Sequence, residues 1–255
     1  SEIMKLAVPM MCAWYLHQRP LPPSLWNVVA VLAMILVPVL LIAEQPDLGT
    51  ALLVAAAGLL VVVLGGLPWT YMLGGTVIAG AAVPLVWSML HDYQRQRILT
   101  LLDPQSDALG AGYHIIQSQI AIGSGGVFGK GWTNGSQAQL EFLPERSTDF
   151  IFAVIGEELG LLGLIALLAG YMYIVGRGMY MSTQCRDAFT RLLSGSIALT
   201  FFVYVFVNAG MVTGLLPVVG VPLPLVSYGG TSLVTLMAGF GMLMSLYSSR
   251  KLLGS

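Results

Sequence analysis

Long apolar runs alternate with short polar connections along most of this chain. Seven runs can be marked, and none has the period-two alternation of a β-strand. They cover residues 3–16, 26–43, 48–66, 71–90, 150–175, 192–215 and 233–247. Because a bilayer offers the backbone no hydrogen-bonding partners, runs of this kind are expected to be membrane-crossing helices. The pattern predicts an all-α, polytopic membrane helix bundle, with a single integral membrane domain over residues 1–255.

Composition agrees with a membrane protein and narrows its function. Hydrophobic residues make up 56% of the chain and charged residues 9%, with a mean hydropathy of +0.83. The net charge of −1 argues against nucleic-acid binding, which depends on basic patches. Cys12 lies in an apolar run and Cys185 in a polar connection, so neither a disulfide nor a metal site is expected. The first run is short for a full span, so we expect an N-terminally truncated fragment that begins inside a helix.

Positive charges in the connections predict the orientation of the spans. They gather at Arg19, in the connection 176–191 and at the C-terminal end, which seven alternating spans place on one side. We expect that side to be cytoplasmic. The other side receives a long extracytoplasmic loop at about 91–149, in which 114–122 is a candidate short amphipathic or re-entrant helix and 123–131 a flexible turn.

Acidic residues near the start of the fifth run are the first candidates for chemistry. Asp149 stands where the long loop meets a helix, so its carboxylate is compatible with a helix N-cap and with a general base at the membrane surface. Glu157 lies about two helical turns further along, where a carboxylate is either bonded to neighbouring groups or part of a polar pathway. The sequence leaves both pairs of alternatives open.

Other charged and proline-rich positions add to the candidate set. Glu2 and Lys5 are three residues apart, a spacing that predicts an ion pair on one helix face or a polar cavity for an anionic headgroup. Lys130 and Arg146 are cations of the long loop, and such side chains suit phosphate groups. The apolar segment 215–232 contains three prolines, so it either stops a helix or is irregular backbone that must be buried in protein or line a cavity.

Several motifs extend over essentially the whole chain. They are SEIMKLAVP at 1–9, QPDLGT at 45–50, FLPERSTDFIFAVIGEELGLLG at 142–163 and PLPLVSYGGTS at 222–232. Together they resemble the SEDS family (shape, elongation, division and sporulation). HDYQRQRI at 91–98 and HIIQSQIAIGSGGVFGKGW at 114–132 resemble its elongation member more than its division member.

This resemblance implies a bundle of about ten helices, of which about seven would be present here. It implies a peptidoglycan glycosyltransferase of the bacterial cytoplasmic (inner) membrane, with its active site facing the periplasm. The substrate would be lipid II, an undecaprenyl-pyrophosphate-linked disaccharide pentapeptide, polymerised into glycan strands for cell-wall elongation and rod shape. Asp149 matches the family's catalytic residue, which would serve as general base for the acceptor hydroxyl while undecaprenyl pyrophosphate departs. Glu2 and Lys5 match the family's Glu–Lys pair.

The resemblance also implies partners and leaves two other classes of function open. The protein partner would be a class B penicillin-binding protein, a transpeptidase that cross-links the strands. Lys130 and Arg146 would meet the departing pyrophosphate, alone or with a divalent cation such as Mg²⁺ or Mn²⁺. Glu157 completes the expected substrate-binding set. The alternatives are a lipid II flippase or transporter, with Glu157 in a proton relay, and a scaffold that only positions the transpeptidase.

Overall fold

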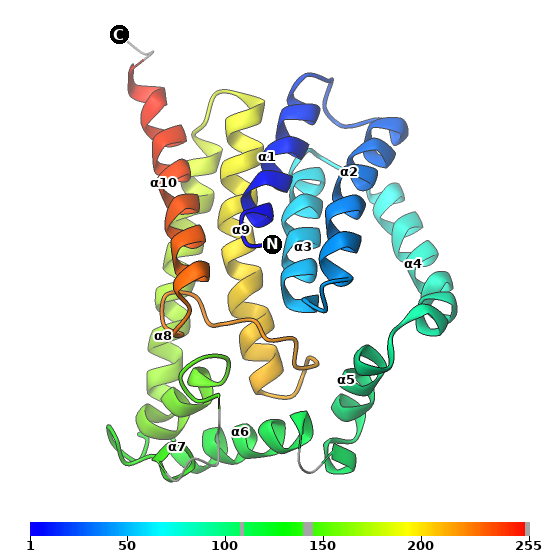
Figure 1. Cartoon of the computed structure of the whole chain (residues 1–255). Coiled ribbons are helices and arrows are strands. Elements are labelled where there is room, and N and C mark those ends of the chain that lie inside the picture. Colours follow the sequence, from blue (N-terminus) through cyan, green and yellow to red (C-terminus); the bar gives the residue numbers. More distant parts are fainter. Residues whose placement is uncertain (108–109, 140–144, 253–255) are drawn as a thin grey trace. The chain divides into compact units, whose positions relative to one another are not determined.

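The computed structural model describes residues 1–107, 110–139 and 145–252, and this part of the chain is helical without strands (Figure 1). All seven apolar runs form helices, as predicted. They are α1 Met4–His17, α2 Leu25–Ala43, α3 Leu48–Leu64, α4 Trp69–Met89, α8 Ile151–Thr183, α9 Ala188–Val212 and α10 Gly230–Leu252. Within the described residues, five of these (α2, α4, α8, α9 and α10) are long and apolar enough to cross a membrane. The fold is therefore that of a multi-pass, all-α membrane protein.

Helices α8 and α9 extend into the connection that the hydropathy pattern predicted at 176–191. Helix α8 continues to Thr183 and α9 begins at Ala188. The connection predicted at 176–191 contains Arg177, Arg186 and Arg191, and only Arg186 lies outside a helix. The 23 residues of α8 after the non-helical Gly160, residues 161–183, span about 35 Å at 1.5 Å per residue, slightly more than a hydrocarbon core of about 30 Å. Hydropathy marks the part of a helix that lies in lipid and misses the polar turns that extend beyond it.

The segment at about 91–149 is largely helical where it is described, although the sequence predicted a long loop. It contains α5 Asp92–Leu102, the 3₁₀ helix η1 Pro104–Asp107, α6 Ala111–Gly125 and the short α7 Ser136–Gln139. Helix α6 confirms the helix expected at 114–122. The polar sequence of α5 hid it from a search for apolar runs, but its start is marked by Gln94, whose side chain accepts a hydrogen bond from the His91 N–H at 3.1 Å.

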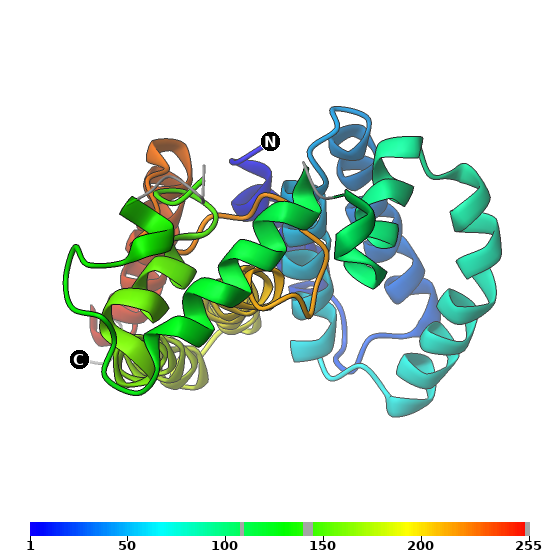
Figure 2. The same ribbon diagram turned by 90° about the horizontal axis from the view of Figure 1, so that it is seen from below.

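Contacts divide the chain into two compact units. The first comprises Ser1–Val83, Tyr173–Val203 and Gly230–Ser255, and the second comprises Pro84–Met172 and Tyr204–Gly229. In the first unit, α1, α2 and α3 pack against one another, and Figure 2 shows them side by side. Their shared core includes Val8, Cys12, Leu16, Val31 and Val54. The prediction of one integral membrane domain over 1–255 stays a prediction.

A break in α8 organises the second unit. At Gly160 the backbone adopts φ 68° and ψ −164°, a region that essentially only glycine occupies. The loop 126–131 bonds to both sides of this break. Backbone N–H groups of Lys130 and Gly131 donate to carbonyls before the break, at 3.0 Å each. Two carbonyls of the same loop accept N–H groups after it, at 2.9 and 3.2 Å. The loop therefore satisfies the backbone groups that the broken helix leaves unpaired.

Glycines make this close approach possible. An added Cβ at Gly129 would collide with the backbone carbonyl of Glu158, and one at Gly160 would lie 2.7 Å from the carbonyl oxygen of Val127. In the glycine-rich stretch 123–131, where composition predicted a flexible turn, residues 123–125 end α6 and residues 126–131 form the loop. The loop is fixed by four backbone hydrogen bonds, and the glycines admit another backbone at short distance.

Candidate active site

Asp149 lies in a tight turn immediately before α8. In this turn the N–H groups of Thr148 and Phe150 both donate to the carbonyl of Glu145, at 3.2 Å. Phe150 is almost fully buried, whereas Asp149 is half-buried. The buried ring therefore anchors the turn while the neighbouring carboxylate keeps access to solvent.

A buried asparagine joins this turn to the proline-rich segment. Asn208 of α9 is fully buried, and its side-chain Nδ2 donates to the carbonyl of Asp149 at 2.9 Å and to the carbonyl of Val221 at 2.8 Å. A buried amide is costly unless it is hydrogen-bonded, and these two bonds satisfy the Nδ2 group, whereas Oδ1 is buried and accepts no hydrogen bond among the described residues. The backbone position of Asp149 is thereby set by a residue 59 positions further along the chain.

The proline-rich segment makes two further bonds to the turn. The Ser227 hydroxyl donates to the carbonyl of Thr148 at 2.5 Å and accepts the N–H of Leu223 at 2.7 Å. The N–H of Tyr228 donates to the carbonyl of Ser147 at 2.9 Å. These contacts confirm that irregular backbone at 213–229 is held against protein, as its prolines and apolar character required.

The carboxylate of Asp149 is poised for acid–base chemistry. Burial raises its pKa above the usual value for aspartate, and the negative charge of Glu145 raises it further. Within the described residues no side chain or N–H donates to this carboxylate, so the helix N-cap proposed as its alternative role is not formed. The ideal Cβ position of Gly220 lies 3.5 Å from Asp149 Oδ2, so the carboxylate abuts a residue that has no side chain. A carboxylate with a raised pKa and open acceptor positions suits a general base.

Lys130 and Glu157 form a second, separate cluster in the same unit. The fully buried Glu157 carboxylate accepts Lys130 Nζ at 2.7 Å, the Ser136 hydroxyl at 3.0 Å and the Gln137 N–H at 3.1 Å. The ammonium of Lys130 also donates to the Ser136 oxygen at 2.9 Å. This closed arrangement supports the bonded, structural alternative for Glu157. A role of Lys130 and Glu157 in substrate binding stays a prediction.

Glu2 and Lys5 belong to the first unit and form the ion pair that their spacing predicted. Lys5 Nζ contacts Glu2 Oε1, and Lys5 is buried. Glu2 lies in the turn before α1 rather than within the helix. Beside the pair is a cavity of about 520 Å³, which has hydroxyl groups in its wall. It is lined by Ser1, Glu2, Ile3, Met4, Gly230, Thr231, Val234 and Thr235.

Asp47 adds a carboxylate that sequence reasoning did not single out. It precedes α3 and accepts the Thr50 N–H at 3.0 Å and the Ser1 hydroxyl at 3.2 Å. Burial acts to raise the pKa of Asp47, but these hydrogen bonds and the charge of Lys5 outweigh it and hold the pKa below its usual value. The signal was an aspartate directly before an apolar run, which is typical of an N-cap. Asn208 was also missed, and its signal was an amide inside an apolar run.

The remaining sequence predictions concern Arg146, the start of the motif at 142–163 and a possible metal ion. Arg146 is half-buried in the same turn as Asp149. Residues 140–144, of which 142–144 begin the motif at 142–163, lie outside the described part. Among the residues that the structure does describe, no three His, Cys, Asp or Glu side chains gather to hold a metal ion.

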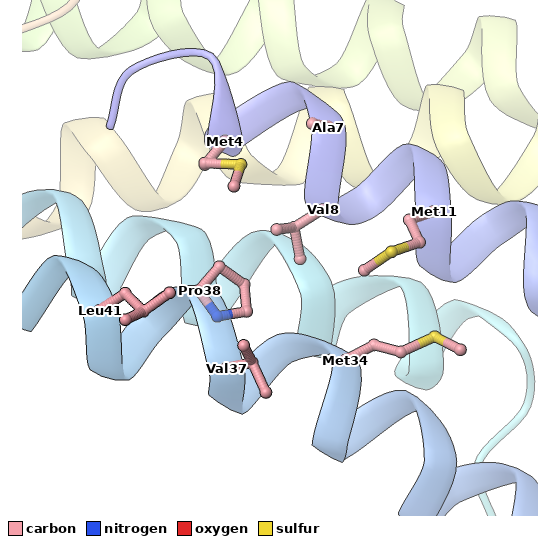
Figure 3. Close-up of a pocket in the computed structure, with 8 residues that line it drawn as sticks. All are labelled: Met4, Ala7, Val8, Met11, Met34, Val37, Pro38 and Leu41. Atoms are coloured by element: carbon pink, nitrogen blue, oxygen red, sulfur yellow. The ribbon is translucent and has the colours of Figure 1, made fainter.

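A groove between α1 and α2 differs chemically from these sites. It has a volume of about 400 Å³, and Figure 3 shows its apolar side chains facing one another across the two helices. The lining is Met4, Ala7, Val8 and Met11 from α1 with Met34, Val37, Pro38 and Leu41 from α2. Since none of these side chains is ionisable, the groove supplies no acid–base group.

The fold and the turn around Asp149 define a multi-pass membrane protein whose candidate chemistry is acid–base. Its sequence matches the FtsW, RodA and SpoVE family, described as cell cycle proteins, over residues 1–252. The chain belongs to this family, as the motifs predicted.

Curated relatives and solved structures agree with this assignment. The chain is 58% identical to the peptidoglycan glycosyltransferase MrdB of Escherichia coli K12 over 254 residues, which cover 99% of this chain and 69% of that protein. It is 37% identical to a probable peptidoglycan glycosyltransferase FtsW of Geobacter metallireducens, over 98% of this chain and 67% of the relative.

Among solved structures, a peptidoglycan synthase complex that coordinates polymerization and crosslinking contains a similar chain. Its TM-score is 0.83 at 34% identity, and the likeness covers 98% of this chain and 69% of that one. The rod shape determining protein RodA of Thermus thermophilus has a TM-score of 0.67 at 29% identity, over 98% of this chain and 65% of that one.

Proposed function

We propose that this chain is a peptidoglycan glycosyltransferase that polymerises lipid II into glycan strands during cell-wall elongation. The observation that carries the proposal is the 58% identity, over 99% of the chain, to a relative named for this activity. The fold supports it, since a substrate with a lipid tail and a sugar headgroup requires a site where a helix bundle meets water. The turn around Asp149 is such a site, because it directly precedes a span.

Asp149 serves as the general base in this proposal. Its carboxylate removes the proton from the 4-hydroxyl of an acceptor GlcNAc as that oxygen attacks C1 of the donor MurNAc. The bond from C1 to the pyrophosphate oxygen breaks with inversion, and undecaprenyl pyrophosphate leaves with the bonding electrons. Three observations support Asp149 in this role: its raised pKa, its lack of a donor among the described residues, and a turn fixed by Asn208 and Ser227.

Cations stabilise the departing pyrophosphate. Arg146 is one candidate because it lies in the same turn as Asp149, and Lys130 is the other, from the cluster with Glu157. Glu2 and Lys5 are candidates for binding the headgroup, and Glu2 lines the cavity in the first unit. A divalent cation, Mg²⁺ or Mn²⁺, would supply the same charge stabilisation, with the pyrophosphate oxygens among its ligands.

The proposed activity also implies a protein partner and a membrane location. A class B penicillin-binding protein is the expected partner, and the likeness to a chain of a synthase complex that couples polymerization with crosslinking supports this. We place the protein in the bacterial inner membrane with Asp149 toward the periplasm, because both sugars of the reaction lie on that side.

The decisive experiment compares Asp149→Asn with the unchanged protein, each purified in complex with its transpeptidase, in the conversion of labelled lipid II to glycan polymer. Asp92→Asn makes the same substitution at an exposed position of the same unit and serves as the control. Loss of polymer in Asp149→Asn alone, with the complex intact, is the expected result. Polymer from every variant would contradict the assignment of the base. No polymer from the unchanged protein, where a control polymerase works, would favour the flippase or scaffold alternatives.

A further inference from the structure

Large apolar side chains are exposed on a loop that lies outside every helix. In the loop after α6, Val127 is 51% exposed, Phe128 81% and Trp132 74%. Loops on an aqueous surface are usually polar, and an apolar patch on one marks an interaction site. The position of this loop along α8 indicates which kind of partner the patch binds.

The loop has a fixed position along α8. Carbonyls of Gly126 and Val127 accept the N–H groups of Leu161 and Leu162, at 2.9 and 3.2 Å. Those two leucines are each about half exposed. The loop backbone therefore lies beside the first residues of α8 after the break, and both segments carry exposed apolar side chains.

The charge pattern of α8 indicates where this helix is expected to enter the hydrocarbon. The charged residues Glu157 and Glu158 precede the break at Gly160, whereas the stretch 161–176 contains no charged residue and belongs to a candidate membrane span. Leu161 and Leu162, to which the loop is bonded, are the first residues of that uncharged stretch. Tryptophan and other amphipathic rings are enriched at this boundary in membrane proteins.

We propose that the loop 126–132 is an interfacial anchor, which inserts Phe128 and Trp132 among the lipids of the leaflet at the start of α8. The partner is the boundary between headgroups and acyl chains, and the anchor is continuous with the lipid-facing surface of α8. This inference rests on the membrane placement of α8 and not on the glycosyltransferase reaction, so either can fail without the other.

The anchor also bears on the position of the candidate active site. Helix α6, which leads into the loop, is bonded to the end of α9. Ser118 Oγ donates to the carbonyl of Val212 at 2.7 Å, and Gln119 Nε2 donates to that of Thr213 at 3.1 Å. Asn208 of α9 is bonded to the backbone of Asp149. In this proposal an anchored loop therefore fixes the distance between the turn around Asp149 and the lipid.

A cysteine label tests the anchor directly. Phe128→Cys in the full-length protein is coupled to an environment-sensitive fluorophore, while the native Cys12 and Cys185 are buried and react slowly. Phe128 points outward, so its replacement leaves the core intact. The labelled protein is placed in nanodiscs of phosphatidylethanolamine and phosphatidylglycerol, with lipids that carry a nitroxide on the acyl chain. Gln96→Cys, at an exposed position of the polar α5, is the matched control.

The expected result is blue-shifted emission at position 128, loss of fluorescence with the nitroxide lipids and protection from aqueous iodide. The label at position 96 should show the reverse. Iodide quenching at position 128 with no effect of the nitroxide would overturn the proposal. So would protection that appears only after the transpeptidase is added, because the surface would then dock a protein helix instead of lipid.

Discussion

The side-chain amide of Asn208 donates hydrogen bonds to the backbone carbonyls of both Asp149 and Val221, at 2.9 and 2.8 Å. A single buried group thus holds the turn that carries the candidate base against the proline-rich segment. Asp149 is therefore positioned through its backbone, while no group among the described residues donates a hydrogen bond to its carboxylate.

Replacement of Asn208 should reduce both stability and polymerisation. Asn208→Ala leaves two buried carbonyls unpaired, at a cost of about 1–3 kcal/mol each. Asn208→Asp should be worse near neutral pH, because a carboxylate oxygen would then face those carbonyls. Thermal unfolding and lipid II polymerisation are measured together, with Asn134→Ala as an exposed control. If Asn208→Asp matched the unchanged protein in both assays, Asn208 would not position the turn.

The rate of polymerisation should fall as the pH drops through the raised pKa of Asp149, because only the deprotonated carboxylate accepts a proton. Glu145→Gln removes one of the two causes of that raised pKa, so the acidic limb of the profile should move to lower pH. Glutamine keeps an oxygen for the Thr148 hydroxyl, which Glu145 accepts at 2.6 Å. The measurement is kcat/KM against pH, and Glu44→Gln is the exposed control. An acidic limb that stays in place or moves to higher pH would contradict the account.

Loss of Lys130 should destabilise the protein more than loss of the charge on Glu157. Lys130→Met strands a fully buried carboxylate, which costs up to about 3–5 kcal/mol when no other bonds compensate. Glu157→Gln leaves an ammonium that is 30% exposed and can be hydrated, so its cost is smaller. Thermal unfolding in detergent compares the two with Arg186→Met, which removes an exposed cation. An unchanged melting temperature in Lys130→Met, together with a raised KM for lipid II, would instead indicate a substrate contact.

Gly160→Ala should destabilise the second unit. The new methyl group would lie 2.7 Å from the Val127 carbonyl oxygen, and the backbone at φ 68° is strained for any other residue, by about 1–3 kcal/mol. Gly170→Ala is the matched control in the same helix, since an added Cβ there meets no atom within 4 Å and alanine favours a helix. Equal thermal stability of the two variants would mean that the break at Gly160 is not required.

Much of the fold could be predicted because long apolar runs identify membrane helices in a sequence. The seven apolar runs correspond to α1, α2, α3, α4, α8, α9 and α10, although α8 ends eight residues and α10 five residues beyond the predicted runs. The polar α5 was missed, because its stability depends on contacts that no hydropathy pattern reveals. The break at Gly160 was missed as well, since it exists only where a second backbone bonds to the helix.

The candidate site was predicted in part. The spacing of Glu2 and Lys5 predicted their ion pair, since the two residues are local in the sequence. The pairing of Lys130 with Glu157 joins residues 27 positions apart, and that of Asn208 with Asp149 joins residues 59 apart. Such bonds depend on how helices pack, which a single sequence does not encode locally.

The break at Gly160 also divides the helix dipole of α8 into two shorter dipoles. A helix carries roughly half a positive charge at its amino end and half a negative charge at its carboxyl end. Because the first part of α8 stops at the break, its negative end falls inside the protein, beside the carboxylate of Glu157. Lys130 meets both, with its backbone N–H on the Glu157 carbonyl and its ammonium on the carboxylate. One lysine thereby balances two negative groups, and the positive end of the same short helix is left facing the turn of Asp149 and any anion bound there.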